Sequence, residues 1–360
     1  MRHLIVPSKK TAEWLGKLRS NGWLMEGTGV IKIDDDFRAI ALSQSAPTSS
    51  DKYEGLEIID MEAKLPGPKS WQNRLSSKTI EKIGKFLPNS YEVQGDVLIV
   101  KLEPEVLDFA DEIGNAFLEQ LNPVRVVCRD DGVQGEFRVR KLTPIASRDQ
   151  NDSTDTVIRE HGIGYHTNPA KAYFSARLGT ERLESAHHCL RLHSDLQRNL
   201  VIYDPYAGVG PNLGLPISDG IVGHIVAGDL NPDAAELLEK NLQVLNSKFS
   251  DFTFEAICAD ALEWSKEPKY CEKADVLFVN IPHSTLDHLP KLLPLLKRRS
   301  QTLVRGWLIL EREGLQESKE KIESMFNGFG ALIHEIDIEE AKGFSTTKCF
   351  TRLTIYSTIE

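Results

Sequence analysis

The segment at residues 200–211 constrains the fold of this chain more than any other. Residues 200–203 are apolar or aromatic throughout, and they lead into Asp204 and then into a tight turn that contains Gly208 and Gly210. This order is typical of a buried β-strand that ends in a glycine loop. Glycine lets the backbone approach a ligand closely and adopt angles that other residues avoid. The segment therefore predicts a strand and a ligand-binding loop of an α/β domain.

Three further apolar runs follow the glycine loop, and they lead to Asp229, Asp260 and Asn280. An acidic residue at the end of the second strand, about twenty residues after the loop, is placed to bind the hydroxyl groups of a ribose. Since the carboxyl ends of parallel strands meet at one edge of a sheet, the sequence predicts a nucleoside-cofactor site on a doubly wound sheet. Asp204 precedes the loop, and the loop has no phosphate-binding Lys-Ser or Lys-Thr pair, which favours S-adenosylmethionine over ATP or NAD.

Composition limits the class of protein. The 360 residues suffice for two or three domains, and the hydrophobic fraction of 41% is that of a soluble globular protein. No apolar run is long enough to cross a bilayer, and no signal peptide is apparent, so we expect a cytoplasmic protein without membrane contact. The five cysteines form no Cys-x-x-Cys pair, which argues against a zinc site or a disulfide framework. The net charge of −10 excludes an overall basic nucleic-acid binder but allows local basic surfaces.

Changes of composition and periodicity divide the chain into three modules. Residues 1–45 predict a small α/β module with a strand, a helix and a hairpin. Residues 46–71 are rich in Ser, Pro and Lys and predict a linker. Residues 72–155 predict an α+β module, and residues 156–360 hold the four strands with polar ends.

A series of motifs between about residues 90 and 290 resembles the archaeal and eukaryotic tRNA (guanine-37-N1)-methyltransferases. Their joint order is more specific than any single motif. The matching segments are residues 95–100, 135–138, 160–162, 172–175, 177–178, 180–182, 204–211, 229–232 and 280–282. The resemblance implies a Rossmann-like class I methyltransferase domain with a mostly parallel doubly wound sheet, after two smaller N-terminal α+β domains.

The same resemblance implies the reaction and its partners. The expected activity is transfer of the methyl group of S-adenosylmethionine to N1 of guanosine 37 in the anticodon loop of tRNA. The first module is then a tRNA-docking domain, and the second contributes to binding of the RNA or the target base. Methyl transfer from a sulfonium needs no metal, so we expect none, and we expect a monomer.

The implied chemistry needs a base for the N1 proton and a partner for the charge that develops on O6. Glu181 falls at the position of the family's proposed catalytic glutamate. Arg138 falls where the family places an arginine against O6, although Arg140 lies two residues on, on the same strand face. Asn280 begins an Asn-Ile-Pro turn, and the resemblance implies that this turn holds the target base. From the local sequence alone, Glu181 also fits a solvated acid on a helix, Arg138 an arginine on the solvated face of a strand, and Asn280 a helix cap.

The remaining site residues also follow from the resemblance. Tyr173 either stacks on the base or packs in an apolar strand, and Asp260 either borders the adenine or caps a helix. The residues expected to bind substrate are Tyr173, Arg138 and Pro282. The residues expected to bind the cofactor are Asp204, Tyr206, Gly208, Gly210, Asp229, Leu230, Asp260, Ala261 and Asn280.

Three other functions stay open. A related enzyme of the wyosine pathway transfers the aminocarboxypropyl group of the same cofactor, but it generally lacks the Asn-x-Pro turn at residues 280–282; methylation of a wyosine intermediate at position 37 is a variant of this alternative. A non-catalytic RNA-binding relative would not need Glu181, Arg138 and Asn280 together. A small-molecule methyltransferase would not need two N-terminal modules.

Overall fold

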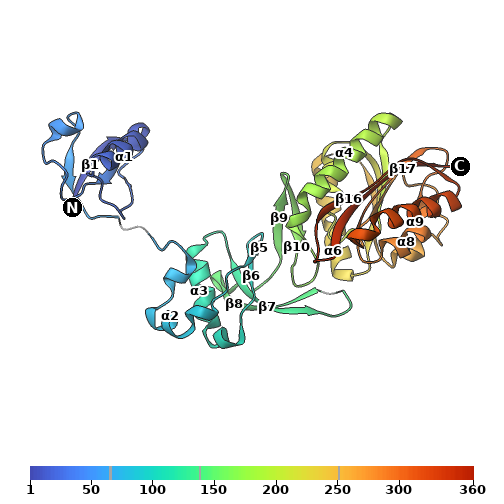
Figure 1. The fold of residues 1–360 in the computed structure, drawn as a ribbon, viewed down its shortest axis with the longest axis horizontal. Helices are drawn as coiled ribbons and strands as arrows, with labels where there is room; N and C mark the ends of the chain where they lie inside the picture. Colours follow the sequence, from blue (N-terminus) through green and yellow to red (C-terminus); the bar gives the residue numbers. More distant parts are fainter. Residues whose placement is uncertain (65–66, 138, 250–251) are drawn as a thin grey trace. The chain divides into compact units, whose positions relative to one another are not determined.

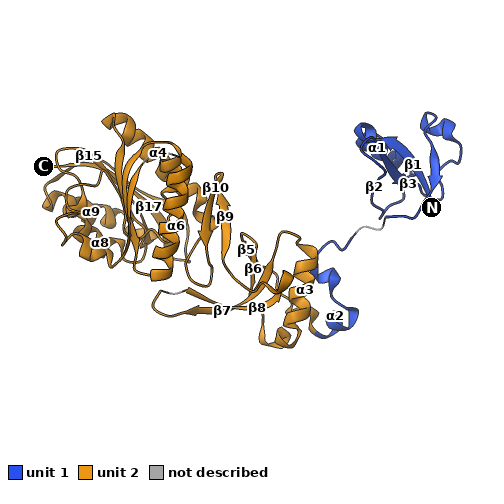
Figure 2. Cartoon of the chain, turned by 180° about the vertical axis from the view of Figure 1, so that it is seen from behind, with its two compact units in different colours: residues 1–82 blue, residues 83–360 orange. Residues whose placement is uncertain are grey.

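The computed structural model covers almost the whole chain. It describes residues 1–64, 67–137, 139–249 and 252–360. The chain forms two compact units, residues 1–82 and 83–360, which Figure 2 shows in blue and orange. None of the helices in the described ranges combines the length and the apolar character that a bilayer crossing requires.

The first unit contains a four-stranded antiparallel sheet in the order β2-β3-β1-β4. Its strands are β1 (Arg2–Pro7), β2 (Ile31–Lys32), β3 (Phe37–Ala41) and β4 (Ile58–Asp60). Helix α1 (Thr11–Ser20) buries Trp14 and Leu18 against this sheet. The strand, helix and hairpin therefore form as the sequence predicts. The predicted linker at 46–71, however, contains β4, whose Ile58 pairs with Leu4 of β1.

The middle module forms a second sheet in the order β5-β6-β7-β8. Its elements are β5 (Glu92–Gln94), β6 (Val97–Val100), α3 (Ala110–Gln120), β7 (Val126–Gln134) and β8 (Val139–Ser147). Helix α2 (Ser77–Ile83) spans the boundary between the two units. Strands β7 and β8 form a long antiparallel hairpin that extends to the pair Gln134 and Val139. A 3-10 helix (Pro104–Phe109) runs directly into α3.

The C-terminal module is built on a seven-stranded sheet in the order β13-β12-β11-β14-β15-β17-β16. The first five strands in this order are parallel, and β17 and β16 are antiparallel. The strands are β11 (Leu200–Asp204), β12 (Val222–Asp229), β13 (Thr253–Cys258), β14 (Val276–Val279), β15 (Gln301–Glu311), β16 (Ala331–Gly343) and β17 (Lys348–Ile359). A separate hairpin of β9 (Thr156–Glu160) and β10 (Ile163–Thr167) precedes them.

Helices cover both faces of this sheet (Figure 1). Successive residues of a strand point to opposite faces, so each strand packs against helices on both sides. Ile202 packs in the core with α4 and α6, whereas its neighbour Tyr203 packs in the core with α7, α8 and α9. The helices are α4 (Gly179–Leu196), α5 (Gly214–Ser218), α6 (Pro232–Phe249), α7 (Ala261–Trp264), α8 (Thr285–Leu292) and α9 (Leu315–Gly328). The predicted Rossmann-like, doubly wound fold is confirmed.

The strand order reverses between β11 and β14. At such a switch point the loops after the two strands run in opposite directions, which opens a crevice at the carboxyl ends of the strands. The glycine loop after β11 and the turn after β14 border this crevice. The topology therefore fixes where a ligand can bind.

Candidate active site

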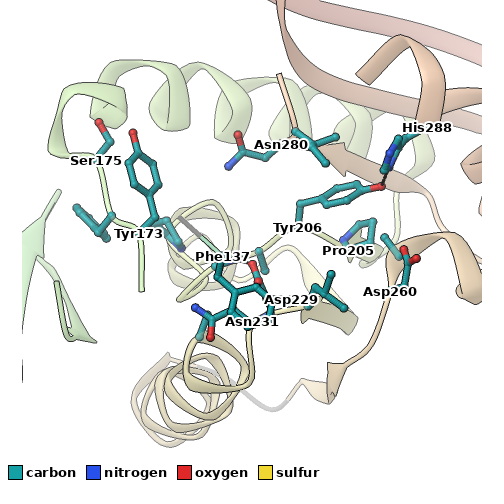
Figure 3. A pocket seen from close by; sticks show the side chains of 18 of the residues that line it. Phe137, Tyr173, Ser175, Pro205, Tyr206, Asp229, Asn231, Asp260, Asn280 and His288 are labelled. Carbon is teal, nitrogen blue, oxygen red and sulfur yellow. Dashed lines mark hydrogen bonds between the residues drawn. The ribbon is translucent and has the colours of Figure 1, made fainter. Parts of the chain in front are cut away.

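A cavity of about 320 Å³ lies at the carboxyl ends of β11, β12 and β14 (Figure 3). Its size falls in the range of small-molecule sites. Eight of the predicted site residues line it: Tyr173, Tyr206, Gly208, Asp229, Leu230, Asp260, Ala261 and Asn280. The described residues Glu181, Asp204, Gly210 and Pro282 do not line it.

Asp229 holds the glycine loop in place. Its Oδ2 accepts the backbone N–H of Gly208 at 3.0 Å, and its Oδ1 accepts the N–H of Asn231 at 2.9 Å. Gly208 has φ 57, a conformation that favours glycine. Burial raises the pKa of Asp229, and the backbone N–H donors oppose that rise. Each carboxylate oxygen keeps lone pairs free, so Asp229 can still accept hydrogen bonds from a ligand in the cavity.

Helix α6 and the β9–β10 hairpin support the same loop from behind. The Nδ2 of Asn241 in α6 donates to the carbonyl oxygens of Val209 and His166, each at 2.9 Å. The hydroxyl of Tyr165 donates to the carbonyl of Pro211 at 3.3 Å. The loop is therefore fixed before any ligand binds, which lowers the entropic cost of binding.

Asp204 lies beneath the glycine loop and is fully buried. Its Oδ1 accepts the N–H of Tyr206 at 3.4 Å, while its Oδ2 has no hydrogen-bond partner among the described residues. Burial raises the pKa of this carboxyl group to about 7; the hydrogen bond from the N–H of Tyr206 opposes the rise, and the charge of Asp229 adds to it. In this structure Asp204 supports the loop and does not face the cavity.

We expect Asp204 to make stability fall as pH rises from about 4 to about 7. Over that range the unfolded chain ionises Asp204, but the folded chain keeps its proton, so the folded state binds more protons. The loss is of the order of 4 kcal/mol for a shift of about three pKa units. Urea denaturation of cofactor-free wild type and Asp204→Asn at pH 5 and pH 8 measures it. Asp204→Asn should gain stability relative to wild type at pH 8, and parallel pH profiles would contradict this expectation.

Tyr206 and His288 form a hydrogen-bonded pair on one wall of the cavity. The tyrosine hydroxyl and the histidine Nδ1 lie 2.7 Å apart (Figure 3). Burial raises the pKa of Tyr206 well above its ordinary value, so the hydroxyl stays protonated. The pair orients the ring of Tyr206 along the wall from the loop after β11.

Asn280 faces the cavity from the first position after β14. Its side chain makes no hydrogen bond to any other described residue. Helix α8 has Ser284 at its N-cap, so the helix-cap alternative for Asn280 does not apply. The turn is held by backbone bonds, since the carbonyl of Pro282 accepts the N–H of Ile309 at 2.9 Å. The backbone of the turn is thus held near Asn280, and the side-chain amide of Asn280 is open to a ligand.

Two exposed aromatic side chains border the cavity. Tyr173 lies in the loop after β10 and is 70% exposed, so the apolar-core alternative is wrong. Phe137 lies at the tip of the β7–β8 hairpin and is 41% exposed. The next residue, Arg138, which the family resemblance implies near O6 of the base, lies outside the described residues. Arg140 is engaged elsewhere, because its Nη2 pairs with Oε2 of Glu92 at 2.7 Å.

Asp260 both borders the cavity and caps a helix. Its side chain accepts the backbone N–H of Leu262 at 2.9 Å, which is an N-cap contact of α7. Ala261 follows it and is buried. Together with Leu230 it gives this end of the cavity an apolar lining that suits a purine ring.

Glu181 lies in the first turn of α4 and is only 8% exposed. Its Oε1 lies 3.3 Å from Nη2 of Arg352, and its Oε2 has no hydrogen-bond partner in the described part of the chain. The solvated-acid alternative is therefore wrong. Its helical neighbours Leu178 and Arg182 line the cavity, so Glu181 stands just behind the cavity wall.

Two family models match consecutive parts of the chain. A model of the TYW2 N-terminal domain matches residues 71–150, and a model of the TRM5/TYW2 methyltransferase domain matches residues 156–305. Together they span well over half of the chain. The chain belongs to the TRM5/TYW2 methyltransferase family.

Curated relatives of this TRM5/TYW2 protein carry consistent names. The tRNA (guanine(37)-N(1))-methyltransferase Trm5b of Pyrococcus abyssi is 30% identical over 65% of this chain and 66% of its own length. The enzyme of the same name from Methanocaldococcus jannaschii is 34% identical over 52% of this chain and 54% of its own length. The chain thus spans about two thirds of the length of the first relative and about half of the length of the second.

A solved structure of aTrm5 in complex with tRNALeu has the same fold as this TRM5/TYW2 protein. The TM-score is 0.68, with 24% identity and full coverage of both chains. At this identity the likeness shows the fold alone.

Sequence reasoning missed some of the cavity of this TRM5/TYW2 protein. Arg182 lines it, and its guanidinium pairs with Glu160 at 2.5 Å and donates to the carbonyl of Ser175 at 2.8 Å. The only signal was that residues 160–162 and 180–182 both belong to the matching motifs. Phe137 also lies in a matching motif, residues 135–138, but its place at the cavity depends on the length of a hairpin.

Proposed function

We propose that this protein transfers the methyl group of S-adenosylmethionine to N1 of guanosine 37 in tRNA. Membership of the TRM5/TYW2 family and the names of the two relatives support this proposal. The observation that carries it is the open amide of Asn280 in the same cavity as the carboxylate of Asp229. One group suits the edge of a base and the other suits a ribose.

The residues present fit an S-adenosylmethionine site. Asp229 would hold the ribose hydroxyls, while Leu230 and Ala261 would border the adenine and Tyr206 and Gly208 would shape the methionine end. The bound cofactor supplies an electrophilic methyl group on a sulfonium. The fixed glycine loop and the apolar lining near Ala261 argue for a preformed nucleoside pocket.

The chain's own residues account for the remaining chemistry. Guanine N1 carries a proton that must leave as the new N–C bond forms, and we assign its removal to the carboxylate of Glu181. Asn280 can donate to and accept from the edge of the base, which fixes N1 in line with the methyl group. Arg138 is proposed to stabilise the charge on O6, and Pro282 to stiffen the turn that presents Asn280.

Tyr173 is proposed to stack on the target base. Tyr173→Ala should raise KM for tRNA by roughly 5- to 100-fold, because stacking of a base on an aromatic ring contributes about 1–3 kcal/mol. Tyr173→Phe keeps the ring and should behave like wild type. Steady-state kinetics with both variants measures the effect. Since Tyr173 is 70% exposed, the melting temperature should not change, and equal KM values for alanine and wild type would refute the stacking role.

The proposal extends to the modules and the setting. We assign tRNA docking to the first module and binding of the target region to the middle module, whose hairpin brings Phe137 to the cavity. The enzyme would act on the anticodon loop, as a monomer and in the cytoplasm. Light scattering with and without tRNA tests the monomeric state. Deletion of residues 1–64 tests the docking role: it should lower the affinity for tRNA and leave the affinity for the cofactor unchanged.

A second candidate is aminocarboxypropyl transfer in the wyosine pathway. The description of the matched N-terminal domain favours it, whereas the Asn280 turn favours methyl transfer. Two preparations of S-adenosylmethionine, labelled in the methyl group or in the carboxyl carbon, distinguish the two reactions on unmodified and on wyosine-precursor tRNA. Methyl label alone in unmodified tRNA supports our proposal. Carboxyl label in the precursor tRNA would support the alternative.

A further inference from the structure

The last two strands of the sheet, β16 and β17, lie beyond the span of both family models. They nevertheless bring a charged side chain, Arg352, against Glu181. We propose that Arg352 is a positioning residue, which holds one oxygen of the Glu181 carboxylate and leaves the other free to take the proton of the substrate. This inference rests on the proposed function, in which Glu181 is the base.

The contact between Arg352 and Glu181 involves a single carboxylate oxygen. Nη2 of Arg352 lies 3.3 Å from Oε1 of Glu181, in a place where the glutamate side chain is 10% exposed. An arginine can bind both oxygens of a carboxylate in parallel, but here Oε2 is buried and has no partner in the described part of the chain. Buried polar atoms are nearly always hydrogen-bonded, so an unpaired carboxylate oxygen calls for a functional reason. A proton acceptor waiting for its substrate supplies that reason.

A second arginine fixes the backbone that carries Glu181. Arg305 of β15 is fully buried, and its Nε donates to the hydroxyl of Ser185 at 3.3 Å. That hydroxyl donates in turn to the backbone carbonyl of Glu181 at 2.8 Å. Arg305 also donates to the hydroxyl of Thr354 of β17 at 2.5 Å, so it links β17 to the first turns of α4. The backbone and one oxygen of Glu181 are thus both held, which leaves the side chain little freedom to rotate.

Arg352 also lies near a second carboxylate. Its Nη1 lies 3.8 Å from Oε2 of Glu339, a largely exposed residue of β16. Arg352 of β17 lies opposite Trp307 of β15 in the antiparallel pair, and Trp307 is buried. One guanidinium therefore lies between an exposed carboxylate and a buried one.

Steady-state kinetics of Arg352→Met and Arg352→Lys with tRNA tests the proposal. Arg352→Met should lower kcat by about 10- to 100-fold, because a small misplacement of a reacting group is enough for such a loss. KM for tRNA and for S-adenosylmethionine should stay within about twofold of wild type, since no binding contact is removed. Arg352→Lys should recover kcat to within about fivefold of wild type, because a contact to one oxygen needs a charge but not a planar fork.

Arg312→Met is the matched control. It removes an arginine that pairs with Glu340 of β16 at 2.9 Å, but on an exposed surface. Its kcat should equal that of wild type. A purely structural role for Arg352 would lower thermal stability and would not separate kcat from KM.

The failure of this inference is distinct from the failure of the proposed function. If Arg352→Met keeps kcat within about twofold of wild type while Glu181→Gln is strongly impaired, the positioning role is wrong and the proposed function stands. If wild type forms no N1-methylguanosine, both are wrong. If Arg352→Met does not fold, Arg352→Gln, which keeps an N–H donor, is measured by the same criteria.

Discussion

Glu181→Gln should lower kcat for methyl transfer to tRNA by about 100- to 10,000-fold, the usual contribution of a general base. Glutamine keeps the size of the side chain and can still contact Arg352, but it cannot take the N1 proton of guanine. KM for tRNA should change little, because the loss falls on the transition state. Single-turnover kinetics with saturating cofactor measures the chemical step directly.

Glu184→Gln provides the control for this experiment. Glu184 lies one turn further along α4 and is partly buried, so it differs from Glu181 mainly in its place relative to the cavity. Its replacement should leave kcat unchanged. A Glu181→Gln enzyme with wild-type kcat would mean that another group takes the proton.

Asp229→Asn should weaken binding of S-adenosylhomocysteine by roughly 5- to 100-fold. Asp229 accepts the N–H groups of Gly208 and Asn231 with its two oxygens and faces the cavity as well. An asparagine replaces one acceptor oxygen by an NH₂ donor, so one of these N–H groups or a ribose hydroxyl loses its partner, and buried unpaired groups cost about 1–3 kcal/mol each. Isothermal titration calorimetry measures the dissociation constant.

Asp260→Asn is the matched comparison for Asp229→Asn. Asp260 is exposed and already caps α7 through the N–H of Leu262. Asparagine is about as good an N-cap as aspartate, so helix α7 should keep its cap. The affinity for S-adenosylhomocysteine should change by no more than about threefold. Equal losses in the two variants would show that negative charge near the cavity, and not the hydrogen bonds of Asp229, governs cofactor binding.

Local sequence patterns predicted the parallel sheet and one half of the cavity. The glycine loop, Asp229 and Asn280 are readable because each follows an apolar run at a fixed place in a doubly wound fold. Asp204 follows the same rule, yet its side chain turns under the loop and is fully buried. Strand order fixes where a residue lies along the sheet, but it does not decide whether a side chain faces the cavity.

The missed features all depend on contacts between distant segments. Strand β4 sits in a polar stretch, and only its pairing with β1 makes it a strand. The partner of Glu181 is Arg352, far along the chain in the antiparallel edge of the sheet. Phe137 reaches the cavity because the β7–β8 hairpin is long enough to bring it there. No local periodicity carries such information.

The most direct test of the central proposal compares two tRNA transcripts that differ only at position 37, one with guanosine and one with adenosine. Each is incubated with wild-type enzyme and S-adenosylmethionine, digested to nucleosides and examined by mass spectrometry. We predict N1-methylguanosine from the guanosine transcript and no methylated nucleoside from the adenosine transcript. Methylation of both transcripts, or of neither under conditions in which the cofactor binds, would contradict the account.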